Sequence, residues 1–164
     1  MEIDVGLLRE TLELRPTFIN KGSQRTIKLQ NRSDVAVAFD WRRHATVDEE
    51  EMTRVSILHH LEKQKQEALE ALLQMQDGQG ANEDLDGRSL LNEPMLQTRR
   101  RFDGLMQVAE KDHFPFQDEA FSIFPSHGTV WPNSEVEVTV TFHPRGPLAY
   151  QSTSYCEIVG RSQR

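Results

Sequence analysis

The residue types best suited to bind a metal ion stand together near the middle of the chain. His59 and His60 lie beside Glu62, and imidazole and carboxylate groups are common metal ligands. Adjacent residues on a helix point about 100° apart, so these two histidines cannot share a face as ligands four residues apart would. We therefore predict no metal site here and expect solvated or interface histidines.

A second candidate is a calcium site between two predicted helices. The segment follows the spacing of an EF-hand loop, with Asn82, Asp84, Asp86, Gly87 and Glu93 at the matching positions. The first position lacks a charge, the eighth is Ser89 where an apolar residue is usual, and no second hand is present. An acidic loop before a capped helix start is the better interpretation, and calcium binding stays a minor hypothesis.

The sequence holds no pattern typical of an enzyme. It has no Gly-x-Ser-x-Gly elbow, and Gly78 and Gly80 are not followed by the Gly-Lys-Ser/Thr of a phosphate-binding loop. The single cysteine, Cys156, cannot form an internal disulfide, and we expect it to act as a small buried hydrophobe. We predict a protein that is not an enzyme and needs no cofactor.

Composition excludes two further classes of function. The net charge is -7, and residues 43–117 hold 15 acidic and 9 basic side chains, so no basic field for nucleic acid exists. No apolar run approaches the ~18 residues of a membrane span, and the first residues lack the layout of a signal peptide. We expect a cytosolic protein, without nucleic-acid partners or membrane insertion.

Strand patterns occupy both ends of the chain. Apolar residues alternate at Val35, Val37, Phe39 and Trp41, which is typical of a half-buried strand. The same alternation, interrupted by turn residues such as Pro16 and Asn31, predicts further strands over residues 3–8, 10–14, 24–30, 136–142 and 150–159. Residues 121–132 predict a strand followed by a corner rich in Pro and Gly.

The middle of the chain changes to a helical period. Acidic residues from Asp48 open a segment whose apolar residues recur every three or four positions to Met75, and a second such pattern runs from about Ser89 to Glu110. Without this hairpin, roughly 90 residues remain, close to an immunoglobulin-like sandwich of about 100. We predict a single domain over 1–164, a mainly β, immunoglobulin-like antiparallel sandwich with residues 44–117 as a helical-hairpin insertion.

Several motifs resemble one family. Asn31 and Ser33 before an aromatic-ending strand, and the block Phe124-Pro125, Gly128, Pro132, Phe142 and Pro144, are similar to the ASH domain. This is a major-sperm-protein-like immunoglobulin domain, found in Hydin and related proteins of the ciliary central apparatus. Asn133 departs from the family, which commonly has Gly there, and the long insertion departs from a minimal domain.

The resemblance implies a non-catalytic scaffold and protein-interaction module in the axoneme of the motile cilium or flagellum, with the central apparatus as its place. It implies that the partners are neighbouring ASH modules and other axonemal scaffold proteins. It also implies that the chain is one module of a larger polypeptide. The alternative is a peptide-binding adaptor at the centrosome, ciliary base or membrane contact sites, which would add a strand to an exposed sheet edge.

The insertion carries the residues that we expect to contact a partner. Its first helix has more apolar surface than one neighbouring helix covers, and its second carries three consecutive arginines that suit an acidic partner such as a tubulin tail. The alternatives are packing of the apolar residues on the second helix and the sandwich, and a solvated face for the arginines. The predicted partner-binding residues are Leu58, Leu61, Leu69, Leu72, Arg99, Arg100 and Arg101.

Overall fold

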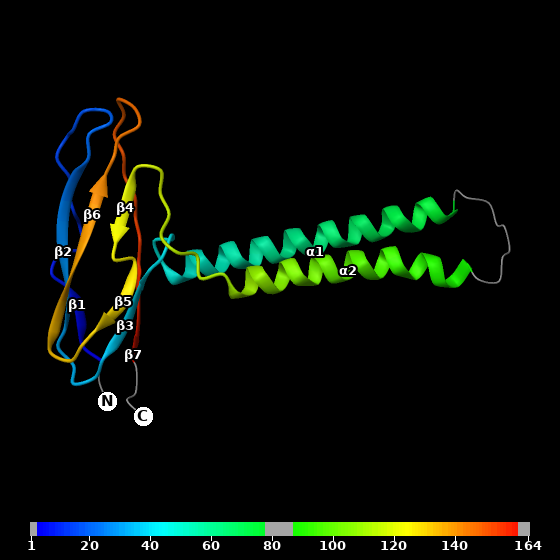
Figure 1. Ribbon diagram of the computed structural model, residues 1–164, viewed down its shortest axis with the longest axis horizontal. Helices are drawn as coiled ribbons and strands as arrows, with labels where there is room; N and C mark the ends of the chain where they lie inside the picture. The colour runs from blue at the N-terminus through cyan, green and yellow to red at the C-terminus, as the bar shows by residue number, and fades with distance from the viewer. Residues whose placement is uncertain (1–2, 78–86, 161–164) are drawn as a thin grey trace. The chain divides into compact units, whose positions relative to one another are not determined.

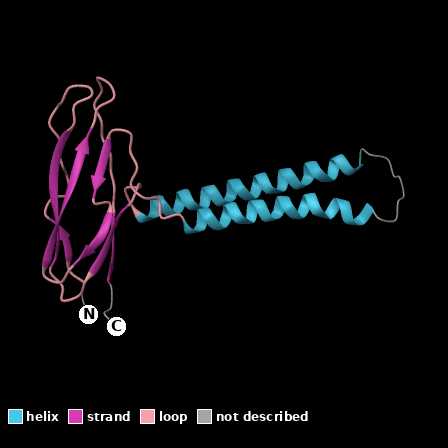
Figure 2. Cartoon of the chain, viewed as in Figure 1, coloured by secondary structure: helices cyan, strands magenta, loops and turns pink. Residues whose placement is uncertain are grey.

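A computed structural model describes residues 3–77 and 87–160 of the chain, which contain seven strands and two helices (Figure 1). By its internal contacts the chain divides into two compact units. The first, Met1–Glu50 with His113–Arg164, holds all the strands, and the second, Glu51–Asp112, holds most of both helices (Figure 2).

The strands form two antiparallel sheets. The order is β1-β2-β6-β4 in the four-stranded sheet and β5-β3-β7 in the three-stranded sheet. The strands are β1 Val5–Leu7, β2 Ser23–Asn31, β3 Val37–Trp41, β4 Phe121–Phe124, β5 His127–Val130, β6 Ser134–Phe142 and β7 Cys156–Gly160. The helices are α1 Val47–Asp77 and α2 Gly87–Lys111. The predicted class is confirmed: a mainly β, immunoglobulin-like sandwich with a helical-hairpin insertion.

The core lies between the two sheets and follows the period-two pattern of the sequence. Val37, Phe39 and Trp41 are at most 4% exposed, as expected for every second residue of a strand. They pack against Val130 of their own sheet and against Leu29 and Val138 of the other. The antiparallel register places Ile27 opposite Val138 and so determines which face of β2 and β6 is buried in the core.

Residues 121–132, predicted as a strand followed by a corner rich in Pro and Gly, contain two strands, β4 and β5, that belong to different sheets. β4 pairs with β6, whereas β5 pairs with β3, so the chain crosses between sheets at Pro125 and Ser126. Proline has no amide to donate to a ladder, and a strand therefore tends to end where it occurs.

Two other strand predictions were wrong in part. Residues 10–14 lie outside both sheets, because backbone pairing next to β2 stops at Leu8, whose amide donates to the Lys28 carbonyl. The last strand begins at Cys156 and not at Tyr150. The Tyr150 ring packs on Phe142, and its hydroxyl accepts a 2.9 Å hydrogen bond from the Gly146 amide, which holds this segment as a loop.

One buried amide side chain ties the two sheets together at the end of β2. Asn31 is 0% exposed, and its Nδ2 donates to the carbonyls of Val35, Val130 and Trp131 at 2.8 to 3.1 Å. Its Oδ1 accepts from the amide and hydroxyl of Ser33. Both polar atoms of this side chain therefore form hydrogen bonds with the turn between β2 and β3 or with the end of β5.

We predict that Asn31→Ala lowers the free energy of unfolding by about 3 kcal/mol, because it leaves several buried carbonyls and Ser33 without a partner. Urea unfolding followed by tryptophan fluorescence measures this loss. Gln30→Ala, next to it on the polar side of β2, is the control and should cost less than about 0.5 kcal/mol. Equal losses in the two variants would contradict a structural role for Asn31.

Candidate functional site

The insertion leaves and re-enters the sandwich through a short extension of the three-stranded sheet. Beyond Trp41 the backbone runs between two segments: the Arg42 amide donates to the Tyr155 carbonyl at 2.9 Å, and the Arg43 amide donates to the Phe114 carbonyl at 2.9 Å. Phe114 is 3% exposed and has a φ of 42°, a conformation that costs energy for a bulky residue. The segments on both sides of the insertion are thus fixed by the sandwich itself. We call residues 42–50, 113–116 and 154–157 the junction.

A buried guanidinium holds the junction together. The Arg42 side chain is only 7% exposed; it donates to the His113 carbonyl and to the Glu157 carboxylate, and its Nε lies 3.4 Å from Asp40. Burial opposes this charge, but the hydrogen bond and charge of Glu157, with Asp40 and Glu50, raise the pKa of Arg42 above its ordinary value. Arg42 therefore stays charged and joins residues from before and after the insertion.

A tyrosine and a carboxylate add a second buried contact. The Tyr155 hydroxyl donates to the Glu50 carboxylate, and Glu50 is only 8% exposed. Burial, followed by the hydrogen bond to Glu50, raises the pKa of Tyr155 to about 12. The bond links the first turn of α1 to the segment that leads into β7.

The start of α1 is fixed by a cap that the sequence analysis missed. The Glu49 amide donates to Thr46 Oγ1 at 3.2 Å, while the Glu49 carboxylate accepts from the Ala45 amide at 3.1 Å. This reciprocal pair is close to a capping box, and the Thr-x-x-Glu spacing is a signal that the sequence does contain. The first turn of the helix thus begins at a defined residue within the sandwich unit.

The two helices of the insertion run antiparallel, and polar side chains form hydrogen bonds and an ion pair between them. Arg54 donates to the carbonyls of Ala109, Glu110 and Asp112, at 2.8 to 3.1 Å, and so satisfies carbonyls at the end of α2. Lys65 forms a 2.7 Å ion pair with Asp103. Neither contact follows from a motif, because each depends on how two helices align.

The residues predicted to bind a partner fall into two groups. Leu58, Leu61, Leu69 and Leu72 are half-buried, and their three- and four-residue spacing from Arg54 and Lys65 places them on the side of α1 that meets α2. Arg99, Arg100 and Arg101 are exposed on α2. The leucines therefore serve the hairpin at least in part, whereas the arginines are accessible.

The other candidates from the sequence are two histidines, the calcium loop and the single cysteine. His59 and His60 are exposed on α1, and no cluster of three metal-ligating side chains occurs among the described residues. Most of the calcium-loop candidate, from Asn82 to Asp86, lies outside the described residues. Burial raises the pKa of the Cys156 thiol to about 12, so it is not poised as a nucleophile.

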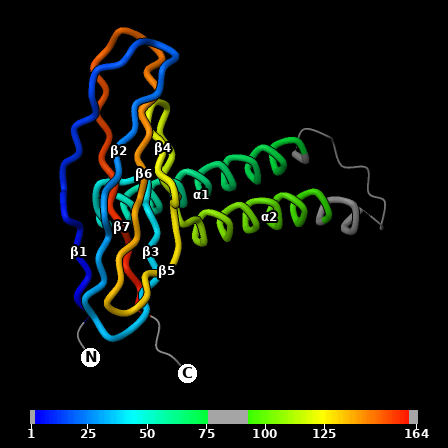
Figure 3. The backbone as a smooth tube through the Cα atoms, turned by 60° about the vertical axis from the view of Figure 1, so that its left-hand side comes forward, coloured from blue at the N-terminus to red at the C-terminus, as the bar shows by residue number. Residues whose placement is uncertain are grey.

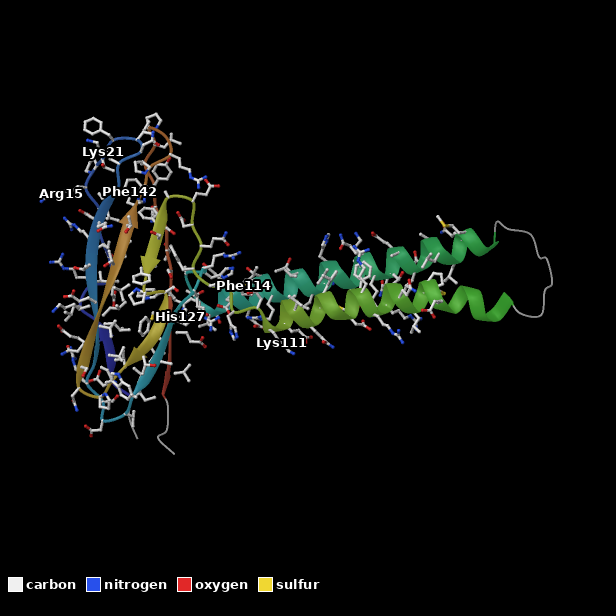
Figure 4. All side chains as sticks on the ribbon, in the orientation of Figure 1. Arg15, Lys21, Lys111, Phe114, His127 and Phe142 are labelled. Atoms are coloured by element: carbon white, nitrogen blue, oxygen red, sulfur yellow. The ribbon has the colours of Figure 1, made fainter. Side chains whose placement is uncertain are left out.

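An apolar groove of about 350 Å³ lies at one end of the sandwich, between the loops that precede β2 and follow β6. Phe18 and Leu148 line it and are 78% and 74% exposed. Figure 4 shows Arg15, Lys21 and Phe142 at this end, and the Lys21 ammonium lies 6.0 Å from the centre of the Phe18 ring. Exposed apolar side chains beside cations are typical of protein-contact surfaces.

We predict that Arg42→Ala lowers the free energy of unfolding by about 3 kcal/mol. Removing one partner of a buried pair costs roughly 3–5 kcal/mol, and the lower value applies because the Glu157 side chain is 43% exposed. The matched control is Arg43→Ala, since Arg43 is exposed and bonds only to Gln117 among side chains of the described residues. Urea denaturation should separate the two variants, and similar midpoints would contradict the role of Arg42.

The raised pKa of Tyr155 predicts a loss of stability in alkali. A group whose pKa is higher in the folded state contributes stability below its unfolded pKa, near 10, and loses it as pH rises toward 12. Absorbance at 295 nm should show a phenol titrating near pH 12, and Tyr155→Phe should remove that step and flatten the stability loss between pH 10 and 12. A wild-type chain in which the Tyr155 phenol titrates near pH 10 would rule this out.

No family model matches this chain. It is 31% identical over 164 residues to the Hydrocephalus-inducing protein of Mus musculus, and 30% identical over 164 residues to the Homo sapiens homologue. Both alignments cover 100% of this chain, which spans 3% of the length of either relative.

The solved ASH / PapD-like domain of human CEP192 (PapD-like domain 7) was also found, with a TM-score of 0.41 and 15% identity over 87% of this chain and 61% of that one. Among the described residues, no helix has the length and apolar composition of a membrane span. The resemblance inferred from the motifs is confirmed by the sequence matches: the chain is homologous to a segment of the Hydrocephalus-inducing protein, Hydin, and its sandwich is an ASH-like domain as in that protein.

Proposed function

We propose that this chain is a non-catalytic scaffold module of the motile-cilium axoneme, in the central apparatus, where it supports motility. The match to the Hydrocephalus-inducing protein carries the proposal, because it runs through the helical insertion as well as the sandwich. In this role the sandwich is a rigid spacer, and the insertion supplies a surface that fixes neighbouring proteins. The partners are adjacent ASH modules and other axonemal scaffold proteins.

The insertion is the part that distinguishes this module from a minimal domain. Ile57 and Leu73 are exposed on α1 at 36% and 46%, beside the half-buried leucine row. The exposed Arg99, Arg100 and Arg101 of α2 suit an acidic surface such as a tubulin tail. We propose that these side chains form the partner-facing surface, with Leu58, Leu61, Leu69 and Leu72 contributing behind them.

A second candidate function is a peptide-binding adaptor at the centrosome, ciliary base or membrane contact sites. The observation that favours it is an outer strand, β7, that has a neighbour on one side only among the described strands. Strand addition to such an edge is a common mode of peptide recognition.

Imaging in motile ciliated cells tests the proposal. The tagged natural protein that contains this chain should label the central axoneme, and replacing residues 51–112 by a Gly-Ser linker should weaken that signal. Because this deletion leaves the junction intact, it removes the insertion with the least disturbance of the sandwich. The variant Arg99→Glu/Arg100→Glu/Arg101→Glu shows how much of the axonemal signal depends on the arginine charges and how much on the rest of the insertion. Signal at the ciliary base or cytoplasmic membranes would discard the scaffold and favour the adaptor.

A further inference from the structure

One long side of the sandwich is incomplete. β7 pairs with β3, and no other described strand lies against it, so its sheet has three strands where the facing sheet has four. In the view of Figure 3, β7 lies on the side of β3 that is nearer to β1, and β5 lies on the side nearer to β4. The open edge of β7 therefore faces the side of the sandwich on which β1 is the outer strand of the opposite sheet.

The hydrogen bonds of β3 show which backbone groups of β7 face outward. The Trp41 amide donates to the Ser126 carbonyl on the β5 side, whereas the Arg42 amide donates to the Tyr155 carbonyl on the β7 side. In an antiparallel ladder this alternation continues from residue to residue. By this register, the backbone groups of Tyr155, Glu157 and Val159 bond to β3. The amide and carbonyl groups of Cys156, Ile158 and Gly160 point toward the open edge.

The side chains of this edge that face the core are apolar and only partly covered. Cys156 and Ile158 pack against the core but are only half-buried, as are Val5 and Leu7 of β1. Ile3 is 43% exposed, and its Cδ1 lies 2.4 Å from where a Cβ on Gly160 would stand. Alternate aliphatic side chains of an added strand would cover this apolar row.

The outer face of the same edge has a different character. Val159 is 53% exposed, and the half-exposed Glu157 carboxylate shares Arg42 with Asp40. A basic residue opposite Glu157 would complement this charge. A second copy of the chain would instead bring another Glu157 to the same edge, in a protein of net charge -7, so the charges favour a partner segment over self-pairing.

We propose that the open edge of β7 accepts an extended segment of a partner polypeptide as the fourth strand of its sheet, antiparallel to β7. Inward positions of the segment are aliphatic, and the outward position opposite Glu157 is Lys or Arg. This inference goes beyond the scaffold role and names the surface and ligand class that the second candidate function, peptide binding by strand addition, would use.

The test uses a fluorescent peptide with the core Val-Thr-Val-Lys-Val, added to the full 164-residue chain. Binding should slow amide hydrogen exchange of Cys156 and Ile158 at least tenfold, while Glu157 and Val159, already bonded to β3, change little. The same peptide with an N-methylated central Val has lost a backbone donor and should bind at least tenfold more weakly. This comparison needs no variant of the protein.

A matched pair of variants tests the edge itself. Ile158→Pro removes an outward amide but no bond to β3, and Ile158→Ala removes the side chain while keeping that amide. Ile158→Pro should bind the peptide at least tenfold more weakly than Ile158→Ala.

Three results would overturn the proposal: equal binding of the N-methylated peptide, slow exchange of Cys156 and Ile158 in the free chain, or protection that rises with protein concentration alone, which would indicate self-pairing. None of them bears on where the natural protein is found in the cell, so failure here is distinguishable from failure of the proposed function.

Discussion

The fold depends on keeping one three-stranded sheet intact while 85 residues separate the end of β3 at Trp41 from the start of β5 at His127. The buried Arg42 guanidinium meets this constraint. It bonds to the His113 carbonyl after the insertion and to Glu157 on β7, and both contacts lie within the sandwich unit. The charge requires these partners because an unpaired buried guanidinium is costly. The sandwich can thus carry an insertion between two paired strands without losing its core.

The two units are stabilised by different interactions. In the sandwich, core residues such as Val37 and Phe39 are almost fully buried between two sheets. In the helical unit, the side chains whose burial is described are at best half-buried, and Arg54 and Lys65 provide defined polar contacts between α1 and α2. A helix pair of this kind buries a narrow stripe and leaves large apolar residues exposed, among them Met52 and Val108. Such a surface is well suited to contact other proteins and contributes little to the core.

The sequence could predict those parts of the fold in which a local period decides the structure. The alternation through Val37 to Trp41 and the three- and four-residue spacing after Asp48 gave the strands and helices. Asn133, where the family commonly has Gly, has a φ of 52°, which shows that the turn needs a left-handed residue that Asn can supply. The corner at Pro125 was predicted, but strand β5 and its pairing with β3 in the other sheet were missed, because the partner of a strand depends on distant segments. Arg42, Tyr155 and the open edge of β7 were also missed, since each depends on contacts between distant segments.

If the junction contacts are sufficient, the β-sandwich folds completely without the helical unit. Urea unfolding of a chain in which residues 51–112 are replaced by a short Gly-Ser linker, followed by the fluorescence of the buried Trp41, tests this. We expect one cooperative transition with a midpoint close to that of the intact chain, because the junction contacts remain. A broad transition, or the loss of native fluorescence before urea is added, would show that the sandwich needs the helices.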